Sequence, residues 1–259
     1  MYDLNSISNY LNTNIIGQSI IQYDSLNSTF IKAKNIFATC PDGTVVLSEN
    51  QSECELRFGN EWICLPDKNI YLSIIMKSVN NNYLLPLIDV LACSSVLKSI
   101  FDLYSLNCKT KWPNDIIING SKACAVKSDI TGKGAGIILS LNINVNMEEK
   151  LENLKSTSVR IEKGEEVERE LLIGSILNNI EYHYDELIST GKASEAVKLY
   201  NESLLFYDKE IEVARRGRKT VRRVVAKNID EEGRLTIINE KGNEEILNPG
   251  DTIIQYEET

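Results

Sequence analysis

The chain has 259 residues, of which 42% are hydrophobic and 25% are charged, and its formal net charge is −9. A chain of this length and composition can bury a core without disulfide or metal support, and we expect one large domain followed by a small one. No apolar run approaches the roughly 20 residues that a membrane-spanning helix needs, so we expect no membrane span. The negative charge argues against a large nucleic-acid interface, because lysine and arginine contacts to phosphates dominate that affinity.

The N-terminal residues lack the basic-then-apolar layout of a secretion signal, so we expect the protein in the cytoplasm. In that reducing compartment the six cysteines, which form no CxxC pair, should remain thiols. The single histidine, His183, lies in an apparent helix and is expected at the surface. With one histidine, a Cys/His zinc site or a Ser-His-Asp triad is not expected.

The first part of the chain alternates short helices and strands. Apolar periodicity predicts helices at 3–11 and 31–37 and strands at 15–23, 44–48 and 70–76. Ser28 and Thr29 precede the second helix, and helix capping alone would explain them. The 49–69 segment is a polar loop of about twenty residues, a length at which loops in compact domains are commonly functional lids or disordered.

The middle of the chain carries the longest apolar helical pattern, at 83–106, which should form a core helix. Extended segments follow at 108–118, 122–130 and 135–145. The pairs Asn119-Gly120 and Thr131-Gly132 between them are typical of hairpin turns, so these segments predict an antiparallel meander.

The C-terminal part changes character after helical patterns at 165–190 and 192–204. Short alternating runs, punctuated by turn pairs at about eight-residue spacing, predict a small barrel. We therefore divide the chain into residues 1–205 and 206–259. Residues 214–223 hold six basic side chains in ten positions, which suits an anionic ligand or nucleic acid but equally a solvated strand edge.

One motif groups chemically useful side chains at the end of a predicted strand. It reads KWPND over 111–115, and Lys122 follows on the returning strand. Asn114 can donate and accept hydrogen bonds, Asp115 can help to hold a cation, and Lys122 can neutralise a phosphate or carboxylate. Such a group suits attack of a carboxylate on a nucleoside triphosphate, although a tight turn with a solvated lysine would explain the same residues.

These residues resemble the active-site signature of the biotin–protein ligase family. The family pattern is KWPND, then Gly-x-Lys, then Ile-Asn-Val-Asn, which stands here at 143–146. Further matches in the family's order are Asp24, Ser28, Thr29, Gln51, Trp62, Ile229, Asp230, Gly233, Leu235 and Gly242. The resemblance covers nearly the whole chain and implies an α+β fold, in which a mixed sheet with flanking helices (a biotin/lipoate ligase-like catalytic domain) precedes a small SH3-like β-barrel. No helix-turn-helix precedes the match, so the family's DNA-binding repressor form is not expected.

The resemblance also implies an activity. Family members join biotin to ATP, hold biotinyl-AMP under an ordered loop, and transfer the biotinyl group to a lysine of a biotin carboxyl carrier domain of a carboxylase. Carried over, the catalytic residues are Lys122, Arg57 and Asp115, with Asp115 as the candidate Mg²⁺ ligand. The biotin residues are Ser28, Thr29, Gln51, Trp62 and Lys122, and the ATP residues are Arg57, Lys111, Asn114, Asp115 and Asn144. A homodimer is compatible with this assignment.

The sequence departs from the family at two places. In the 54–60 loop, where the family has Gly-Arg-Gly-Arg-x-Gly-Arg, only Arg57 and Gly59 match, and Glu55 would place a like charge beside an anionic intermediate. Elsewhere, bulkier or different residues stand at Phe30, Ala125, Ser140 and Asn142. The last two replace glycines that line the pocket, and they narrow it unless a one-residue shift of register turns them away.

Three functions therefore remain open. The first is a biotin–protein ligase whose unusual loop relies on Arg57. The second is a non-catalytic protein that binds a ligand or a carrier domain. The third is a related acyl-adenylate transferase for another carboxylic acid, lipoate-like or otherwise. The fold alone does not choose among them, because function resides in the site.

Overall fold

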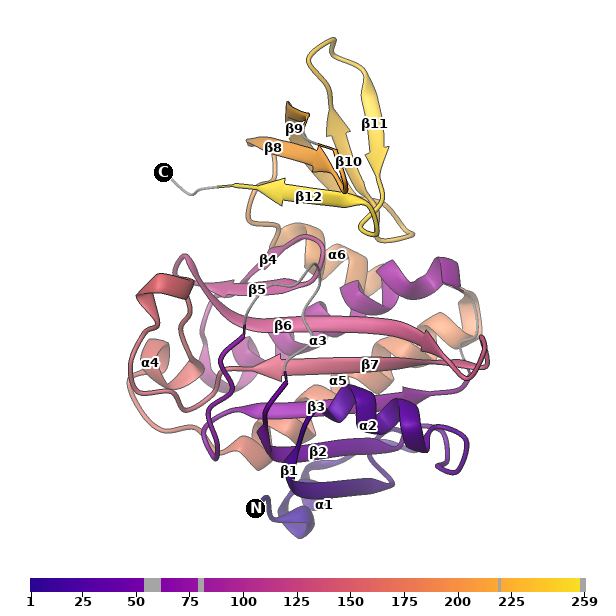
Figure 1. Cartoon of the computed structure of the whole chain (residues 1–259), viewed down its shortest axis with the longest axis vertical. Coiled ribbons are helices and arrows are strands. Elements are labelled where there is room, and N and C mark those ends of the chain that lie inside the picture. Colours follow the sequence, from indigo (N-terminus) through magenta and orange to yellow (C-terminus); the bar gives the residue numbers. More distant parts are fainter. Residues whose placement is uncertain (54–61, 79–81, 219, 257–259) are drawn as a thin grey trace.

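The computed structural model describes residues 1–53, 62–78, 82–218 and 220–256. In these ranges the chain forms a seven-stranded mixed sheet with helices and a separate five-stranded antiparallel sheet (Figure 1). The expected α+β class is thereby confirmed. The expected closure of the C-terminal barrel is wrong, because its edge strands β11 (Glu244–Leu247) and β12 (Thr252–Gln255) do not pair with each other in the described residues.

The large sheet contains the strands of the predicted meander. Its order is β1 (Ile20–Leu26), β2 (Val45–Gln51), β3 (Ile70–Met76), β7 (Gly136–Ile143), β6 (Ser121–Thr131), β5 (Asp115–Ile118) and β4 (Lys109–Lys111). Only β1 and β2 run parallel among these described neighbours. Asn119 and Gly120 have positive φ angles of 46° and 77°, as a two-residue type I′ hairpin requires, so the predicted turn is confirmed.

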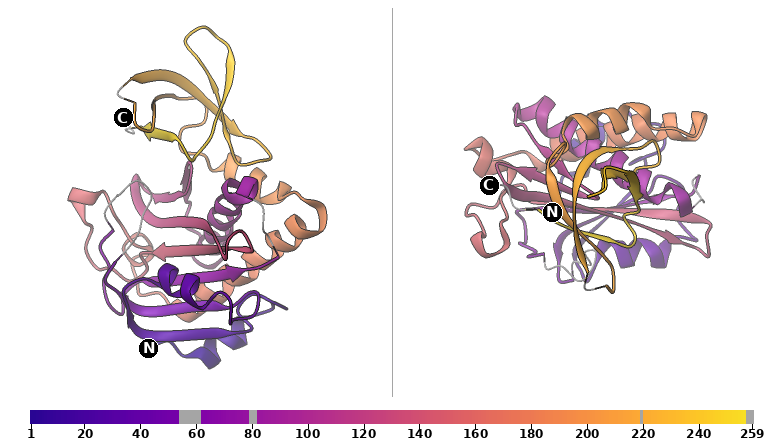
Figure 2. Two further views of the ribbon diagram at one scale, coloured as in Figure 1. Left: turned by 45° about the vertical axis from the view of Figure 1, so that its right-hand side comes forward. Right: turned by 90° about the horizontal axis from the view of Figure 1, so that it is seen from above.

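Helices cover the two faces of this sheet unequally (Figures 1 and 2). α3 (Leu85–Tyr104) and α5 (Arg169–Thr190) lie on one face, with α1 (Leu4–Tyr10) packed against α5 and α6 (Ser194–Glu202) against α3. α2 (Thr29–Ile36) lies on the opposite face, against β2, β3 and β7. Because successive strand residues point to opposite faces, every second residue of β3 and β7 faces α2.

The residues of the large core lie between the sheet and α3 and α5, and a smaller apolar cluster lies under α2. All residues of β3 and of β7 are buried, which explains their nearly continuous apolar runs. The face toward α2 nevertheless includes polar members, such as Ser73 on β3 and Ser140 on β7. This face therefore differs chemically from an ordinary apolar core.

Two expected boundaries differ for identifiable reasons. The strand predicted at 15–23 begins at Ile20, because the backbone N–H groups of Asn14, Ile15 and Ile16 donate to the Glu181 carboxylate and so leave the ladder. The segment predicted as extended at 108–118 is interrupted between β4 and β5. A short helix, α4 (Val159–Lys163), was not predicted.

The C-terminal sheet has the order β11, β10 (Leu235–Ile238), β9 (Val221–Ile229), β8 (Glu210–Arg215) and β12. It contacts the large sheet through Trp112, whose indole N–H donates to the Gly233 carbonyl at 3.0 Å. Asn201 adds two hydrogen bonds to the backbone of Ile229. These contacts place the small sheet over the KWPND turn.

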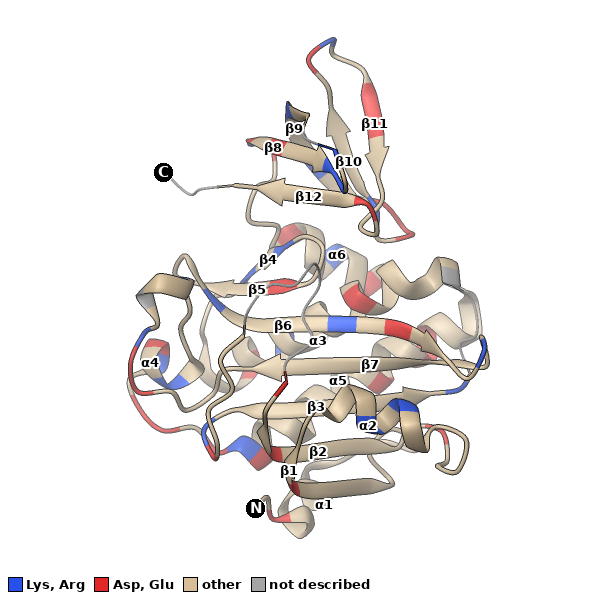
Figure 3. Ribbon diagram, viewed as in Figure 1, with Lys and Arg blue, Asp and Glu red and all other residues tan. Residues whose placement is uncertain are grey.

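The basic segment 214–223 spans the β8–β9 hairpin, in which both strands are interior to the sheet, so the expectation of an edge is wrong. Three of its arginines form ion pairs: Arg215 with Asp251, Arg222 with Glu245 and Arg223 with Glu212. In Figure 3 basic and acidic stretches are mixed in this sheet. The pairing favours a solvated, internally compensated surface over an anion site.

Three further expectations concern the whole molecule. No helix within the described ranges is long and apolar enough to cross a membrane. Cys40, Cys93, Cys108 and Cys124 are free, whereas Cys64 is disulfide-bonded, so the expectation of thiols is wrong for Cys64. His183 is fully buried on α5, so its expected surface position is also wrong.

Candidate active site

Lys122 and Asp115 meet beside an irregularity in the pairing of β5 with β6. The register between these strands shifts between Ile116 and Ile117, and the Nζ atom of Lys122 lies 2.6 Å from Oδ2 of Asp115. The two side chains are only 23% and 20% exposed. The structure therefore brings together two of the three predicted catalytic residues.

Lys111 adds a second positive charge at this place. It is the register partner of Asp115 on β4. Burial lowers the pKa of Lys111; Asp115 opposes that shift, and the positive charges of Lys122 and Lys155 reinforce it. We call Lys111, Asp115 and Lys122 the charged group. Its two lysines lie beside one aspartate, and this excess of positive charge suits a carboxylate or phosphate.

The turn between β4 and β5 is tied to β6. The Trp112–Pro113 peptide bond is cis, and Trp112 is buried under the C-terminal sheet. Asn114 is 8% exposed; its carbonyl accepts from the N–H of Val126 at 2.9 Å, and its Nδ2 donates to the Val126 carbonyl. Asn114 therefore holds the motif against β6, and its expected contact with the nucleotide remains a prediction.

A second group of polar side chains lies on the face covered by α2. Oε1 of Gln51 accepts from the N–H of Thr29 at 2.8 Å and from its hydroxyl at 3.1 Å. Ser73 donates to Thr29 at 2.9 Å and lies 3.1 Å from the Ser140 hydroxyl. Nε2 of Gln51 reaches Oδ1 of Asn142 at 3.4 Å. We call Thr29, Gln51, Ser73, Ser140 and Asn142 the polar cluster; each of them is at most 5% exposed.

The polar cluster resolves the question of register. Ser140 and Asn142 face Thr29 and Gln51, the predicted biotin residues, and so do not turn away from them. Ser28 behaves as the capping alternative predicts, since its hydroxyl accepts from the N–H of Ile31 at 3.4 Å. A ligand contact of Ser28 stays a prediction.

Two other departures from the family lie beside the polar cluster. Phe30 is 4% exposed within the small apolar cluster, and the Nζ atoms of Lys34 and Lys127 lie 4.5 and 4.3 Å from its ring centre. Ala125 is 2% exposed and is the register partner of both Asp115 and Asn142. Ala125 therefore separates the charged group from the polar cluster.

The charged group and the polar cluster are neighbours across one row of the sheet. Asp115, Ala125, Asn142 and Tyr71 are successive register partners on β5, β6, β7 and β3. Neighbouring strands lie about 4.8 Å apart, so Asp115 and Asn142 are separated by roughly 10 Å. This distance suits an elongated ligand with a polar head at one end and a carboxylate at the other.

The remaining predicted residues lie near the end of β7, in the segment before β3, or outside the described part. Asn144 is 2% exposed, and its Oδ1 accepts from Nδ2 of Asn69 at 3.1 Å. Trp62 is half-buried in the segment that leads to β3. Arg57 and Glu55 lie outside the described residues.

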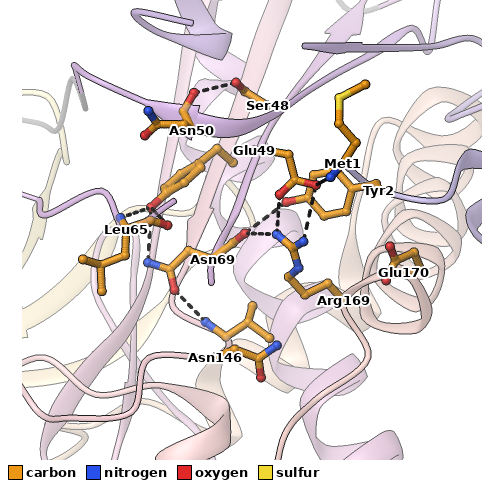
Figure 4. A network of polar contacts seen from close by, with 12 residues as sticks. Met1, Tyr2, Ser48, Glu49, Asn50, Leu65, Asn69, Asn146, Arg169 and Glu170 are labelled. Atoms are coloured by element: carbon orange, nitrogen blue, oxygen red, sulfur yellow. Dashed lines mark hydrogen bonds and ion pairs between the residues drawn. The ribbon is translucent and has the colours of Figure 1, made fainter. Parts of the chain in front are cut away.

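The structure also reveals a network that sequence reasoning missed (Figure 4). Arg169 forms two hydrogen bonds to Glu49, at 2.8 and 3.3 Å, and a third to the Asn69 carbonyl at 3.1 Å. Glu49 also lies 3.1 Å from the Met1 ammonium. Burial alone would raise the pKa of Glu49, but the hydrogen bonds from Arg169 and the ammonium outweigh it and hold that pKa below its ordinary value. The partners are 120 residues apart, and no local pattern links them.

The predicted Mg²⁺ ligand is a single carboxylate. The described residues contain no group of three or more His, Cys, Asp or Glu side chains that could hold a metal ion. Magnesium is commonly bound by one or two carboxylates together with substrate phosphates. Asp115 therefore fits a magnesium ion that a nucleotide triphosphate helps to hold.

Comparisons with known proteins find similarity to one family. A model of the biotin/lipoate A/B protein ligase family matches residues 21–146. The bifunctional ligase/repressor BirA of Bacillus subtilis is 27% identical over 190 residues, which cover 70% of this chain and 58% of that protein. Biotin–protein ligase 2 of Arabidopsis thaliana is 23% identical over 199 residues, covering 73% of this chain and 60% of that protein.

A solved structure shares the fold. The biotin protein ligase from Aquifex aeolicus in complex with biotin and ATP superimposes with a TM-score of 0.81 at 18% identity. The match covers 93% of this chain and 100% of that one. It therefore includes the C-terminal sheet as well as the large sheet.

Proposed function

Because this chain belongs to the biotin/lipoate A/B protein ligase family, we propose that it activates biotin with ATP and transfers the biotinyl group to a lysine of a carrier domain. The observation that carries this proposal is the row of register partners between Asp115 and Asn142. It sets a charged group suited to a carboxylate and phosphate beside a buried cluster suited to a polar ring.

The proposed first step forms a mixed anhydride. A carboxylate oxygen of biotin attacks the α-phosphorus of ATP, and pyrophosphate leaves. Lys122 would neutralise the carboxylate and the α-phosphate as they approach each other, which requires its ammonium to exchange Asp115 for the substrate. Lys111, Asn114 and Asn144 would bind the nucleotide.

The proposed second step consumes the anhydride. The neutral amine of a carrier lysine attacks the acyl carbonyl carbon, an amide bond forms, AMP leaves with the electrons of the broken acyl–oxygen bond, and the nitrogen releases one proton to solvent. Asp115 would hold a Mg²⁺ ion during the first step, where the ion would supply charge neutralisation at the triphosphate. Arg57 would steady the adenylate between the two steps.

The polar cluster would hold the head of the acid. Thr29 and Gln51 can donate to and accept from a ureido ring, Ser28 lies at the same helix start, and Trp62 would cover the aliphatic tail. The carrier domain of a carboxylase is the proposed macromolecular partner. The division at residues 205 and 206 and a cytoplasmic location belong to the same proposal.

One observation favours a second candidate. Ser140 and Asn142 stand where the family has glycines, and their side chains face Ser73 and Gln51 inside the cluster. They narrow the space available to a bicyclic head, so a related acyl-adenylate transferase for a slimmer carboxylic acid is the alternative. A protein that binds its ligand without chemistry would keep the cluster but release no pyrophosphate.

The test is calorimetry of the purified protein with biotin, with and without Mg-ATP, together with an assay of pyrophosphate release. Biotin binding with pyrophosphate release is the expected result. Biotin binding without release would favour the non-catalytic alternative. Absence of biotin binding by the wild type, with binding gained in Ser140→Gly/Asn142→Gly, would show that these side chains exclude biotin and would favour another acid.

A further inference from the structure

Asn69 lies between the segment that follows Trp62 and Asn144, the asparagine proposed to bind the nucleotide. It is wholly buried and immediately precedes β3. Its Nδ2 donates to Oδ1 of Asn144 at 3.1 Å and to the Tyr71 hydroxyl at 3.2 Å, and its Oδ1 accepts from the N–H of Val145 at 3.1 Å. Every polar atom of this amide is therefore engaged.

These contacts determine the orientation of two side-chain amides. The backbone N–H of Val145 can only donate, so the atom of Asn69 that faces it must be the oxygen. The NH₂ group of Asn69 then faces Asn144, which must present its own oxygen in return. It follows that the NH₂ group of Asn144 is the end that can turn toward a ligand.

The backbone of Asn69 is held as firmly as its side chain. Its carbonyl accepts from the Tyr2 hydroxyl at 3.0 Å and from Arg169 at 3.1 Å (Figure 4). Arg169 is itself fixed by its two hydrogen bonds to Glu49. Arg169 thus links Glu49 and Asn69, the first and last residues of the 49–69 segment.

Tyr71 extends the same network to the segment after Trp62. Its hydroxyl oxygen accepts from the N–H of Leu65 at 2.7 Å and from Nδ2 of Asn69, so its proton is directed to the Leu65 carbonyl at 3.3 Å. Asn69 thereby orients the amide of Asn144 directly and, through Tyr71, contacts the backbone of Leu65.

We propose that Asn69 is a positioning residue for base recognition: it orients Asn144 so that the NH₂ group of Asn144 donates to an acceptor on the adenine ring. This inference rests on the proposed binding of ATP by Asn144. Asn69 itself touches no substrate. The N–H of Val145 orients the amide of Asn69, and Asn69 in turn orients the NH₂ group of Asn144, which would contact the ligand.

The substitution Asn69→Asp changes only the donor side of the amide. The carboxylate keeps an oxygen for Val145 but presents a second acceptor to Asn144, whose amide then rotates to donate to it. The oxygen of Asn144 would then face the adenine. The hydrogen bond from the Asn144 NH₂ group to the adenine acceptor would be replaced by repulsion between two acceptors. Asn69→Ser, which removes the amide without adding charge, serves as a second variant because a buried carboxylate can weaken folding.

Asn146 provides a matched control. It is 4% exposed; its Nδ2 donates to the Val167 carbonyl at 2.8 Å, and its Oδ1 accepts from the N–H of Val167 at 2.9 Å. Asn146→Asp therefore disturbs a buried asparagine of the same segment without changing Asn144. Any loss of affinity that it shares with Asn69→Asp reflects loosening of the segment.

The experiment measures Kd by calorimetry for ATP, biotin and inorganic tripolyphosphate, the last of which lacks the base. We expect Asn69→Asp to raise the Kd of ATP about tenfold, the size of one lost hydrogen bond, with less effect in Asn69→Ser. The Kd values of tripolyphosphate and biotin should stay within about twofold, and Asn146→Asp should leave all three within that range.

The outcomes separate this inference from the proposed function. An unchanged Kd of ATP in both Asn69 variants overturns the inference alone, as does an equal loss for ATP, tripolyphosphate and biotin. ATP binding without pyrophosphate release by the wild type overturns the proposed function alone. Failure of the wild type to bind ATP overturns both.

Discussion

The ammonium of Lys122 lies 2.6 Å from the carboxylate of Asp115, with Lys111 paired in register to the same aspartate from the neighbouring strand. Lys122 lies on β6 beside β5, and its side chain is only 23% exposed. In the proposed reaction, a substrate carboxylate or phosphate would take the place of Asp115 as the partner of Lys122.

Replacing Lys122 with methionine should reduce pyrophosphate release by about 10²-fold or more, because one preorganised charge at the reacting centre is lost. Folding should persist, since the side chain is 23% exposed and its aliphatic part is retained. The control is Lys109→Met, on the exposed position two residues before Lys111. Turnover of Lys122→Met within twofold of the wild type would remove Lys122 from the mechanism.

Replacing Arg169 with methionine should lower the free energy of unfolding by about 3–5 kcal/mol, because it leaves the Glu49 carboxylate buried without its guanidinium. Glu49 and Arg169 are 2% and 13% exposed. The double variant Glu49→Gln/Arg169→Met should recover part of that loss. Urea denaturation of the wild type and of both variants measures the free energy of unfolding.

The exposed pair Arg160–Glu148 provides the comparison for this prediction. Its side chains lie 3.0 Å apart and are 30% and 55% exposed. Arg160→Met should therefore cost less than about 1 kcal/mol. A cost for Arg169→Met as small as that of Arg160→Met would contradict the importance assigned to the buried pair.

Replacing Gly233 with alanine should disturb the contact between the two sheets. Gly233 has a φ of +76°, and an added Cβ would lie 2.8 Å from the carbonyl carbon and oxygen of Pro86. Gly242 has a φ of +79° with nothing near the corresponding position. Gly242→Ala should cost only about 1 kcal/mol for its backbone conformation, and Gly233→Ala should cost a further 1–3 kcal/mol or so for the clash.

Thermal unfolding followed by tryptophan fluorescence measures this difference in a Trp62→Phe background, which leaves Trp112 as the only tryptophan of the sequence; its indole donates to the Gly233 carbonyl. A shifted emission spectrum in Gly233→Ala alone is expected, since the clash lies beside the indole. Equal destabilisation by the two substitutions would show that the close approach to Pro86 relaxes without cost.

His183 should make stability depend on pH. Its side chain is wholly buried, and neither ring nitrogen has a hydrogen-bond partner in the described part of the chain. Burial lowers the pKa of His183 from its ordinary value of 6.5; Glu195 and Glu186 oppose that shift and Lys98 reinforces it. The unfolded chain therefore takes up a proton more readily than the folded protein does.

The contribution of neutral His183 to the free energy of unfolding is therefore complete above pH 6.5. It is lost as the pH falls, by up to about 1.4 kcal/mol per pH unit. Denaturant unfolding at pH 7.5 and pH 5.5 should show a larger loss for the wild type than for His183→Leu. Glu49 stays ionised in this window because its pKa is lowered. Identical losses in the two proteins would mean that His183 is protonated when folded.

Local patterns were sufficient for much of the fold. The strand at 70–76, the core helix and the hairpin at Asn119-Gly120 follow from apolar periodicity and from residues that accept positive φ. The KWPND motif and Lys122 could also be placed on adjoining strands, because a two-residue turn limits the register of a hairpin. Their resemblance to a known family then indicated the class of chemistry.

Tertiary structure alone decided the composition of the site. Ser140 and Asn142 point toward Gln51 because of the register between β3 and β7. That register is determined by contacts between residues far apart in the chain. The burial of His183 depends on which side of α5 meets α3, and the contact of Arg169 with Glu49 spans 120 residues. Periodicity determines which residues can share a face, whereas long-range packing determines which faces meet and hence which polar groups become partners.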